Sequence, residues 1–531
     1  MFLSSYPFTF LQTLVTLIIL YVIRYTYWQL TTGAGRRAFA ASHGCQPLKR
    51  WNDLDPFFGL DLLWQVYKNM LTHTTLETTQ RRFEELGRDS GRLQLLGQSV
   101  ISTTSPQNIK HVLSTDFSSY SLGDDRKKLM TPFLGQGIFT TDGRAWQHSR
   151  DLLRPNFTRH QITDNVVVFE THVKNVIRAV GAKQVGVGMV DLQEVFFGMS
   201  LDVATEFLFG VSTGVLASNG GEREGKEEDV KRFIEAFEYS QSAMEGKAGR
   251  WGILGFFLPD PRLKREHKVV HDFVDGLIKK ALHKQPTYES SKLTNPTHYI
   301  FLHELLTRTS SVPTVRSELL NILLAGRDTT ASLLSNVWFQ LARSPSIWTR
   351  LQSEVAELNG SNPTYEDLKE MKYLRAILNE SLRLHPVVPE NGRQAERDTV
   401  LPCGGGEDGK APVLVKKGEL VAYSSYVMHR RKDFFGEDAD VFKPERWIDG
   451  EGDGEGGKGL RCGWEYLPFN GGPRICIGQQ FALTEAAYVT ARLVQEFEAI
   501  KSMDSEPWRE KLTLTCCSLG GCKVALTPRT K

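Results

Sequence analysis

A single cysteine lies in a glycine-rich stretch near the C-terminal end of the chain, Phe469-Asn470-Gly471-Gly472-Pro473-Arg474-Ile475-Cys476-Ile477-Gly478-Gln479-Gln480. Helical periodicity resumes at Phe481, so Cys476 occupies a junction between a loop and a helix. Backbone N–H groups and a helix N-terminus favour a thiolate at such a junction, and glycines let the backbone approach a flat ligand closely. We therefore predict that Cys476 is a thiolate ligand and that Arg474 faces a carboxylate. A buried, unreactive cysteine is the alternative.

The neighbours of Cys476 favour the ligand interpretation, because they match the F-x-x-G-x-R-x-C-x-G haem-thiolate signature at every defined position. On these residues the chain resembles the cytochrome P450 family. The resemblance implies that Cys476 is the axial ligand of the iron of haem b. It also implies that Phe469 and Arg474 bind this cofactor.

Two further segments resemble the family in the same order along the chain. Glu380-Ser381-Leu382-Arg383 matches E-x-x-R, a spacing that is common on helix surfaces and carries little weight alone. Phe442-Lys443-Pro444-Glu445-Arg446-Trp447 looks like the F-x-P-x-R-W segment of the family. The resemblance implies that Glu380, Arg383 and Arg446 form a buried salt-bridge triad that braces the cysteine loop.

The longest helical pattern runs over Val315–Leu341 and is apolar on nearly all sides, which predicts a helix through the centre of the protein. Midway along it, Ala325-Gly326-Arg327-Asp328-Thr329-Thr330 resembles the oxygen-activation motif of the family. A threonine hydroxyl there can bond back to the carbonyl four residues earlier. The resemblance assigns Asp328 and Thr329 as an acid–alcohol pair that steers protons to bound dioxygen. A polar helix-packing patch is the alternative.

Three more residues are implied as cofactor contacts. Trp146 and Arg150 match the W-x-x-x-R helix that the family lays along a haem propionate, and bidentate arginine–carboxylate contacts suit that role. Arg393 falls where many members have another propionate arginine. An ordinary surface arginine is the alternative for Arg393.

The N-terminus predicts a membrane anchor. Phe2 to Ile23 carries no charged residue, and about 20 apolar residues span a bilayer. A cleaved signal peptide is the alternative, but Met1–Pro7 lacks the basic leader that one needs. The first basic residues follow the apolar run, which predicts a single-pass protein of the endoplasmic reticulum membrane with a cytosolic catalytic domain. We expect an anchor over 1–30, a basic, proline-containing linker over 31–60 and a haem-thiolate monooxygenase domain over 61–531.

Composition agrees with a globular chain that has a large core, with 40% hydrophobic residues. The 64 Lys+Arg and 62 Asp+Glu leave a net charge of +2, so we expect no nucleic-acid partner. Seven cysteines, an odd number, argue against a disulfide framework. Helical patterns dominate and strand-like runs are few, so we predict a mainly α, cytochrome P450 fold with small accessory β-sheets. The strand-like runs are Val413–Val415, Leu420–Tyr423, Leu512–Cys516 and Lys523–Leu526.

Within the family, the chain looks like the fungal alkane and fatty-acid hydroxylase group over nearly its whole length, including Leu324–Ala331, Gly404–Gly409 and Phe469–Glu485. The resemblance implies a membrane-bound monooxygenase that uses O2, most simply for terminal hydroxylation of n-alkanes or fatty acids. Glu390 and Gly392 depart from the expected pattern in a segment that should border the substrate chamber. Alternatives therefore stay open: a tailoring hydroxylase of a fungal secondary metabolite, a haem-thiolate isomerase, or a non-enzymatic haem-binding membrane protein.

An electron donor is also implied. An anchor and a haem domain leave no room for a flavin domain, so we expect a separate NADPH-dependent, flavin-containing reductase in the same membrane. Basic residues near the cysteine side are candidates for its docking site: Arg144, Arg154, Arg430, Arg431 and Lys432.

Overall fold

A computed structural model describes residues 6–51, 55, 58–185, 188–216, 226–250, 260–283, 300–452 and 457–530. The described helices are α1 Tyr6–Trp28, α2 Ala34–Ser42, α3 Leu60–Thr72, α4 Thr75–Leu86, α5 Pro106–Lys110, α6 Asp124–Leu134, α7 Gly143–Leu153, α8 Arg159–Asp164, α9 Val166–Gln184, α10 Leu192–Phe209, α11 Lys226–Arg250, α12 Pro261–His283, α13 Phe301–Arg308, α14 Val312–Leu341, α15 Pro345–Ala356, α16 Tyr365–Glu370, α17 Lys372–Leu384, α18 Ser425–Met428, α19 Lys432–Phe435 and α20 Gln479–Glu496. The strands are β1 Ser90–Leu95, β2 Gln98–Thr103, β3 Tyr120–Ser121, β4 Val190–Asp191, β5 Glu390–Ala395, β6 Thr399–Gly405, β7 Ala411–Val415, β8 Leu420–Ser424, β9 Phe497–Ser502, β10 Glu510–Leu512, β11 Cys516–Ser518 and β12 Lys523–Pro528. The mainly α architecture with small sheets confirms the predicted fold class.

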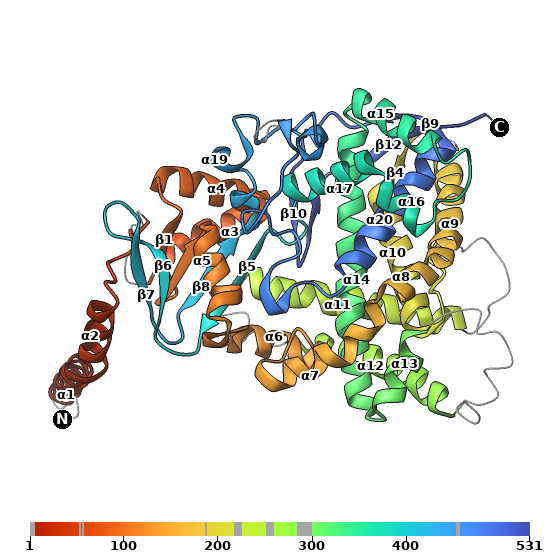
Figure 1. Ribbon diagram of the computed structural model, residues 1–531. Coiled ribbons are helices and arrows are strands. Elements are labelled where there is room, and N and C mark those ends of the chain that lie inside the picture. The colour runs from red at the N-terminus through yellow and green to blue at the C-terminus, as the bar shows by residue number, and fades with distance from the viewer. Residues whose placement is uncertain are drawn as a thin grey trace.

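The long helix α14 runs through the helical part of the molecule, as its all-round apolar pattern predicts (Figure 1). Its 30 residues make it about 45 Å long at 1.5 Å per residue. The C-terminal half of α14 shares one buried cluster with α9, α10, α15, α17 and α20. The N-terminal half shares a second cluster with α6, α7, α11, α12 and α13. The functional segment at residues 325–330 lies where these two clusters meet.

Strands β1, β6, β7 and β8 lie at the left of Figure 1, whereas the sheet of β4, β12 and β9 lies at the right among the helices. One sheet has the strand order β1-β2-β8-β5-β3, in which β2 and β8 are parallel and the other neighbours antiparallel. Pairing of Arg393 with Val421 fixes the register of β5 against β8. A third buried cluster fills this region and includes Ile101, Val421 and Tyr423. The sheet therefore anchors β5 and the chain leading into it.

One strand prediction is wrong. Leu512–Cys516 is not a continuous strand, because β10 turns back and pairs with β11 in the register Leu512↔Cys516. The N–H of Thr513 donates to the carbonyl of Thr515 at 2.8 Å and closes the turn between them. Alternating apolar residues at 512, 514 and 516 look like one strand in the sequence, whereas the pairing makes them the two arms and tip of a hairpin.

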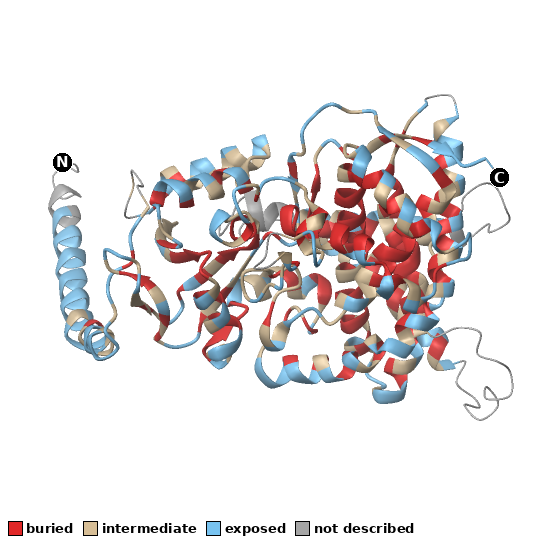
Figure 2. Ribbon diagram, turned by 45° about the horizontal axis from the view of Figure 1, so that its top comes forward, coloured by how far each residue is buried: buried red, intermediate tan, exposed pale blue. Residues whose placement is uncertain are grey.

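The N-terminal helix stands apart from the buried core and is exposed along its described length (Figure 2). Within the described residues, one helical stretch, Leu11–Ser42, is long and apolar enough to cross a membrane. The expected linker is partly helical through α2, and its Leu48 and Arg50 form single bridges to Gly405 and Arg92. Residues 1–5 of the anchor and 52–54 and 56–57 of the linker lie outside the described part of the chain.

Candidate active site

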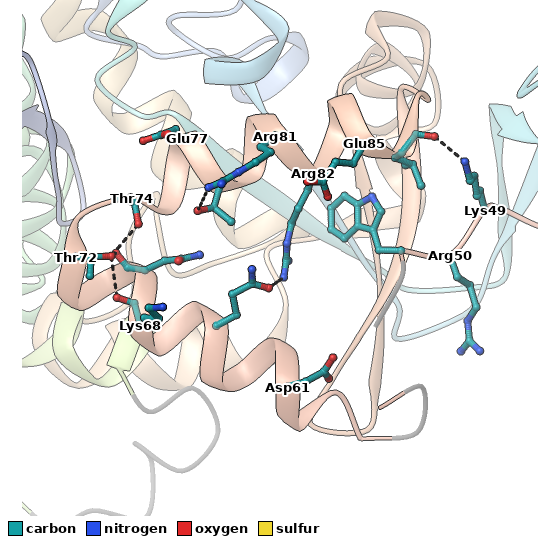
Figure 3. Close-up of a pocket in the computed structure, with 15 residues that line it drawn as sticks. Lys49, Arg50, Asp61, Lys68, Thr72, Thr74, Glu77, Arg81, Arg82 and Glu85 are labelled. Atoms are coloured by element: carbon teal, nitrogen blue, oxygen red, sulfur yellow. Dashed lines mark hydrogen bonds between the residues drawn. The ribbon is translucent and has the colours of Figure 1, made fainter. Parts of the chain in front are cut away.

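A cavity of ≈ 310 Å³ lies between α14 and the cysteine loop, which we define as residues 467–478. Its distal face is formed by Ala325, Gly326, Thr329 and Thr330 of α14, and its proximal face by the cysteine loop with Cys476. A larger hollow of ≈ 500 Å³ lies between α3 and α4 (Figure 3). Arg82 of α4 bonds to Gln65 of α3 across it. Of these two spaces, the one between α14 and the cysteine loop is lined by both a thiol and the polar segment of α14. It is therefore the candidate active site.

Backbone geometry holds the cysteine loop in place. Gly472 has φ +68°, and a Cβ there would lie 1.9 Å from the carbonyl oxygen of Leu113, so only glycine fits. The N–H of Cys476 donates to the carbonyl of Phe469 at 3.0 Å. Asn470 also has a positive φ, and its side-chain oxygen accepts from the hydroxyl of Tyr423 at 2.9 Å. These contacts aim the Cys476 side chain into the cavity.

The thiol of Cys476 is subject to opposing influences. Burial raises its pKa, while the N–H of Gly478 and the guanidinium of Arg150 lower it. The loop-to-helix junction therefore helps the thiolate, as expected, but burial outweighs that help. A coordinated metal ion deprotonates a thiol outright, so this environment suits a metal ligand rather than a free nucleophile.

Glu380, Arg383 and Arg446 come together behind the cysteine loop, and all three side chains are 0% exposed. Two nitrogens of Arg383 donate to the Glu380 carboxylate at 2.8 and 2.9 Å. Arg446 adds a contact at 3.4 Å, and the Trp447 indole donates at 2.9 Å. Buried charges are stable only when paired and fully hydrogen-bonded, and Glu380 meets that condition.

His429 connects this triad to the cysteine loop. Its carbonyl accepts from Arg383 at 2.8 Å, and its Nε2 accepts from the N–H of Leu467 at 2.8 Å. Burial and the nearby Arg383 and Arg430 lower the pKa of His429 to about 3. The imidazole is therefore neutral at physiological pH and keeps a lone pair for the loop. No motif in the sequence singles out His429.

Arginines gather at the edge of the cavity, where the sequence predicts propionate contacts. The cavity lining includes Arg150, Arg393 and Arg474 together with Trp146. Arg474 donates to Asp142 at 2.6 Å and lies over the Trp146 ring at 4.4 Å. Arg393 is 4% exposed and bonds to Gly392 O at 2.7 Å. The carboxylate that pairs with Arg474 belongs to the protein itself.

Arg126 of α6 is a further member of this group, and the sequence did not predict it. It lines the cavity and donates to Asn391 Oδ1 at 3.3 Å. Burial and the neighbouring Arg393 lower the pKa of Arg126 to about 10, and burial likewise lowers the pKa of Arg474 to about 10. No local motif surrounds Arg126, so only the packing of α6 against β5 reveals it.

The arginine group fits the two propionates of haem b. Arg393 Nε is buried and has no hydrogen-bond partner among the described residues. Crowded cations with an unused buried donor are stabilised by carboxylates at the same edge. With Cys476 on one face and these donors at the rim, the cavity has the chemistry that an iron porphyrin dicarboxylate requires.

On the distal face, Thr329 and Asp328 point in different directions. Thr329 lines the cavity, and its hydroxyl donates to the carbonyl of Ala325 at 2.6 Å, the back-bond expected from the sequence. Asp328 lies outside the cavity lining, is 3% exposed and accepts from the amide of Gln241 on α11. Burial raises the pKa of Asp328, and Arg327 and Gln241 lower it.

A second acid, Glu485 of α20, reaches the cavity and was not identified from the sequence. Burial raises its pKa to about 8, and the Thr330 hydroxyl lowers it. Its Oε1 has no hydrogen-bond partner among the described residues. The cavity therefore holds a neutral carboxylic acid beside α14 at neutral pH.

The segment expected to border the substrate chamber does line the cavity, but the side chain of Glu390 does not take part. Val388, Asn391 and Arg393 line the cavity, but Glu390 lies by Thr79 of α4. Successive side chains of a strand point to opposite faces, so when Asn391 and Arg393 of β5 face the cavity, Glu390 faces away. The carboxylate does not meet a substrate in the cavity.

The candidate docking residues also separate into two kinds. Arg430 pairs with Asp440, Arg431 with Asp89 and Asp433, and Lys432 with Glu437. Arg144 and Arg154 are exposed and form no ion pair among the described residues. Arg144 and Arg154 are therefore free of competing ion pairs within the described part of the protein, whereas Arg430, Arg431 and Lys432 already have acidic partners there.

Comparison with known proteins agrees with this site. The family model described as Cytochrome P450 matches residues 56–518. The chain is 43% identical to cytochrome P450 monooxygenase himC of Aspergillus japonicus, over 91% of this chain and 84% of that protein. It is 42% identical to cytochrome P450 52A12 of Debaryomyces hansenii, over 89% and 90% of the two chains, and 42% identical to cytochrome P450 52A5 of Candida maltosa, over 84% and 85%.

The family match covers the cysteine loop, the triad and α14 together. Cytochromes P450 are haem-thiolate monooxygenases that hold haem b, and the cysteine-facing cavity with its arginine rim fits that cofactor. The chain belongs to the cytochrome P450 family.

Proposed function

We propose that this monooxygenase hydroxylates a long aliphatic chain at or near its end, with an n-alkane or a fatty acid as substrate. The overall change is RH + O2 + NADPH + H⁺ → ROH + H2O + NADP⁺. The observation that carries the proposal is the apolar lining beside Thr329, which includes Ile322, Ala325, Val387, Val388 and Leu514. Glu390 does not belong to that lining, so its carboxylate does not oppose an aliphatic chain there.

The side chains have distinct tasks in this reaction. When bound, haem b supplies dioxygen activation and C–H oxidation. Cys476 would hold the iron, and Arg126, Arg393 and Arg474 would bind the propionates. Thr329 would present a hydroxyl inside the cavity, and Asp328 would supply protons from behind α14. The apolar walls would exclude water from the cavity. The end of the aliphatic substrate would then be the part that reaches the Thr329 hydroxyl.

We further propose that electrons come from a separate NADPH-dependent flavoprotein reductase. Arg144 lies in the first turn of α7 and Arg154 directly follows that helix, and both are exposed without ion pairs among the described residues. An acidic docking face would complement them. Arg144→Glu should raise the reductase concentration needed for half-maximal rate, whereas Lys432→Glu should not, because Lys432 already pairs with Glu437.

The proposed location is the endoplasmic reticulum membrane, with residues after the anchor in the cytosol. The apolar helix at Leu11–Ser42 is compatible with membrane anchoring, and the first basic residues follow its apolar run. Asn359 is exposed and begins the sequon Asn359-Gly360-Ser361. Asn359 should stay unglycosylated. A glycosidase-sensitive mass shift at Asn359 would show that the catalytic domain lies on the lumenal side of the membrane.

The direct test is reductase-supported turnover of dodecane, dodecanoate and hexadecanoate, with product positions read by mass spectrometry. Hydroxylation at or next to the terminal carbon is the expected result. A reduced, carbon-monoxide-bound difference spectrum first establishes thiolate ligation. Oxidation of a ring-containing metabolite and of none of these chains would favour the tailoring-hydroxylase alternative.

The two remaining alternatives are less compatible with the distal face. An isomerase needs no proton supply to dioxygen, and a binding protein needs neither acid nor alcohol there. Both Asp328 and Thr329 are present at one turn of α14. If no class of substrate gave an NADPH-dependent product, the isomerase and the binding-protein alternatives would be favoured.

A further inference from the structure

Helix α11 reaches the functional turn of α14 through two polar side chains that are one helical turn apart. The amide nitrogen of Gln241 donates to Asp328 Oδ2, and the two residues are 6% and 3% exposed. Glu238 accepts from Arg327 Nη2 at 2.5 Å and is half exposed. Arg327 and Asp328 are consecutive residues of α14, and they bind Glu238 and Gln241, which are one turn apart on α11. Of these two contacts, the one made by Gln241 is buried.

The Asp328 carboxylate is directed toward α11, where it accepts from the Gln241 amide. Neighbouring residues on a helix are about 100° apart, so Thr329 can face the cavity while Asp328 faces α11. Among the described residues, the cation nearest to Asp328 is Arg327, whose Nη1 is 3.7 Å from Asp328 Oδ1, beyond hydrogen-bond distance. The short contact to Asp328 is thus made by a neutral amide, which can be released at a smaller cost than an ion pair.

Helix α11 is packed independently of this bond. Phe237 is buried against Phe133 of α6 with ring centroids 5.3 Å apart. Phe233 is buried and stacks on Phe273 of α12 at 4.3 Å. These aromatic contacts supply the apolar area that docks the helix. The Gln241 amide is therefore not needed to hold α11 in place.

We propose that Gln241 is a positioning residue for proton supply: its amide orients the Asp328 carboxylate on the α11 side of α14 and so couples the position of α11 to the delivery of protons toward Thr329. This inference rests on the proposed role of Asp328 in the monooxygenase reaction. It predicts that loss of the amide donor changes how electrons are used, not whether substrate or cofactor binds.

The experiment uses the full-length, haem-loaded enzyme with its reductase. Gln241→Met keeps the side-chain length and removes the donor. We expect product per NADPH to fall several-fold and peroxide release to rise, with an unchanged substrate-induced spectral shift. Turnover driven by added hydrogen peroxide should stay near the wild-type rate, because peroxide carries its own protons. Glu238→Gln is the matched control, since it changes a polar side chain of the same helix one turn away that has no hydrogen bond to Asp328 and bonds to Arg327 instead.

Gln241→Glu gives a readout that a structural role would not produce. A protonated glutamic acid can donate to Asp328 and a carboxylate cannot, so coupling should fall as pH rises in this variant alone. The other charged groups that act on Asp328 are Arg327 of α14, Glu238 of α11 and Lys511 of β10. They are unchanged in both Gln241 variants, so the wild-type profile corrects for them in that comparison.

Hydrogen–deuterium exchange of α11 amides is the readout that does not depend on activity. Protection of α11 should be the same in wild type and Gln241→Met. Unchanged coupling in Gln241→Met, an equal loss in Glu238→Gln, or loss of α11 protection together with peroxide-driven turnover would each overturn the proposal. Failure of the proposed function is distinguishable, because it appears as absence of product in the wild-type enzyme.

Discussion

The proximal and distal faces of the cavity are held by different kinds of interaction. Behind the proximal face, one fully buried carboxylate, Glu380, accepts from two arginines, an indole and a backbone N–H. On the distal face, Thr329 has one hydrogen bond to its own helix, and Asp328 has one amide donor from a neighbouring helix. The proximal contacts are many and charged, and the distal contacts are single and mostly neutral.

This difference agrees with what each face has to do. A metal ligand must stay at one distance and angle, and several charge-assisted bonds around a buried carboxylate resist displacement. A proton path must exchange partners during each turnover, and single neutral hydrogen bonds permit that at modest cost. We therefore expect proximal substitutions to remove the cofactor or the fold, and distal substitutions to leave both intact and alter the reaction.

The largest effect is expected from Cys476→Ser on the proximal face. Turnover and the thiolate-type carbon-monoxide spectrum should be lost, because Cys476 is the thiol in the cavity lining. Cys462→Ser and Cys517→Ser are the matched controls, since neither thiol belongs to that lining. An equal loss in either control with Cys476 intact would show that the ligand is assigned to the wrong cysteine.

Glu380→Gln should have the next largest effect. Removing one partner of a buried ionic cluster leaves the other charges uncompensated and costs about 3–5 kcal/mol. Haem content after purification and the urea midpoint should both fall. Glu366→Gln removes an exposed pair with Arg159 and should cost less than about 1 kcal/mol. Equal midpoints for the two variants would contradict the bracing role.

Thr329→Ala tests the distal face. Haem content and the substrate-induced spectral shift should be nearly unchanged, while product per NADPH falls several-fold and peroxide release increases. Ser335→Ala is the control: it removes the same back-bond to a carbonyl four residues earlier, 2.6 Å long, at a buried position outside the cavity lining. A similar fall in Ser335→Ala would assign the effect to the helix backbone instead of the cavity hydroxyl.

The smallest effect is expected at Glu318, where α14 meets α7. Glu318 is 1% exposed, and burial raises its pKa to about 7. Because the folded-state pKa lies above the ordinary value, the unfolded chain loses its proton first, and wild-type stability falls as pH rises through about 7. Glu318→Gln should therefore gain stability relative to wild type between pH 5 and 8, by at most about 1.4 kcal/mol per unit of pKa shift.

Urea unfolding of the two proteins at pH 5 and pH 8 measures this difference. Glu498→Gln, at an exposed position of β9, is the control and should show no such trend. A constant difference between Glu318→Gln and wild type across this pH range would mean that Glu318 titrates as it does in water.

The sequence by itself determined those parts of the fold and the site in which the interacting residues are close together along the chain. The cysteine loop is one continuous stretch, and Gly472, Arg474 and Cys476 act within a few residues of one another. The central helix follows from its own apolar pattern, and the Thr329 back-bond from its spacing to Ala325. Local sequence is sufficient here because the interacting groups are neighbours along the chain.

Only the tertiary structure decided which distant residues meet at the cavity. Arg126 joins Arg393, Gln241 meets Asp328, and Glu390 turns away through contacts that link separate elements. The hairpin at Leu512–Cys516 likewise depends on which strands pair. These outcomes depend on side-chain direction, and direction depends on the register and packing of helices and strands that are far apart in the sequence.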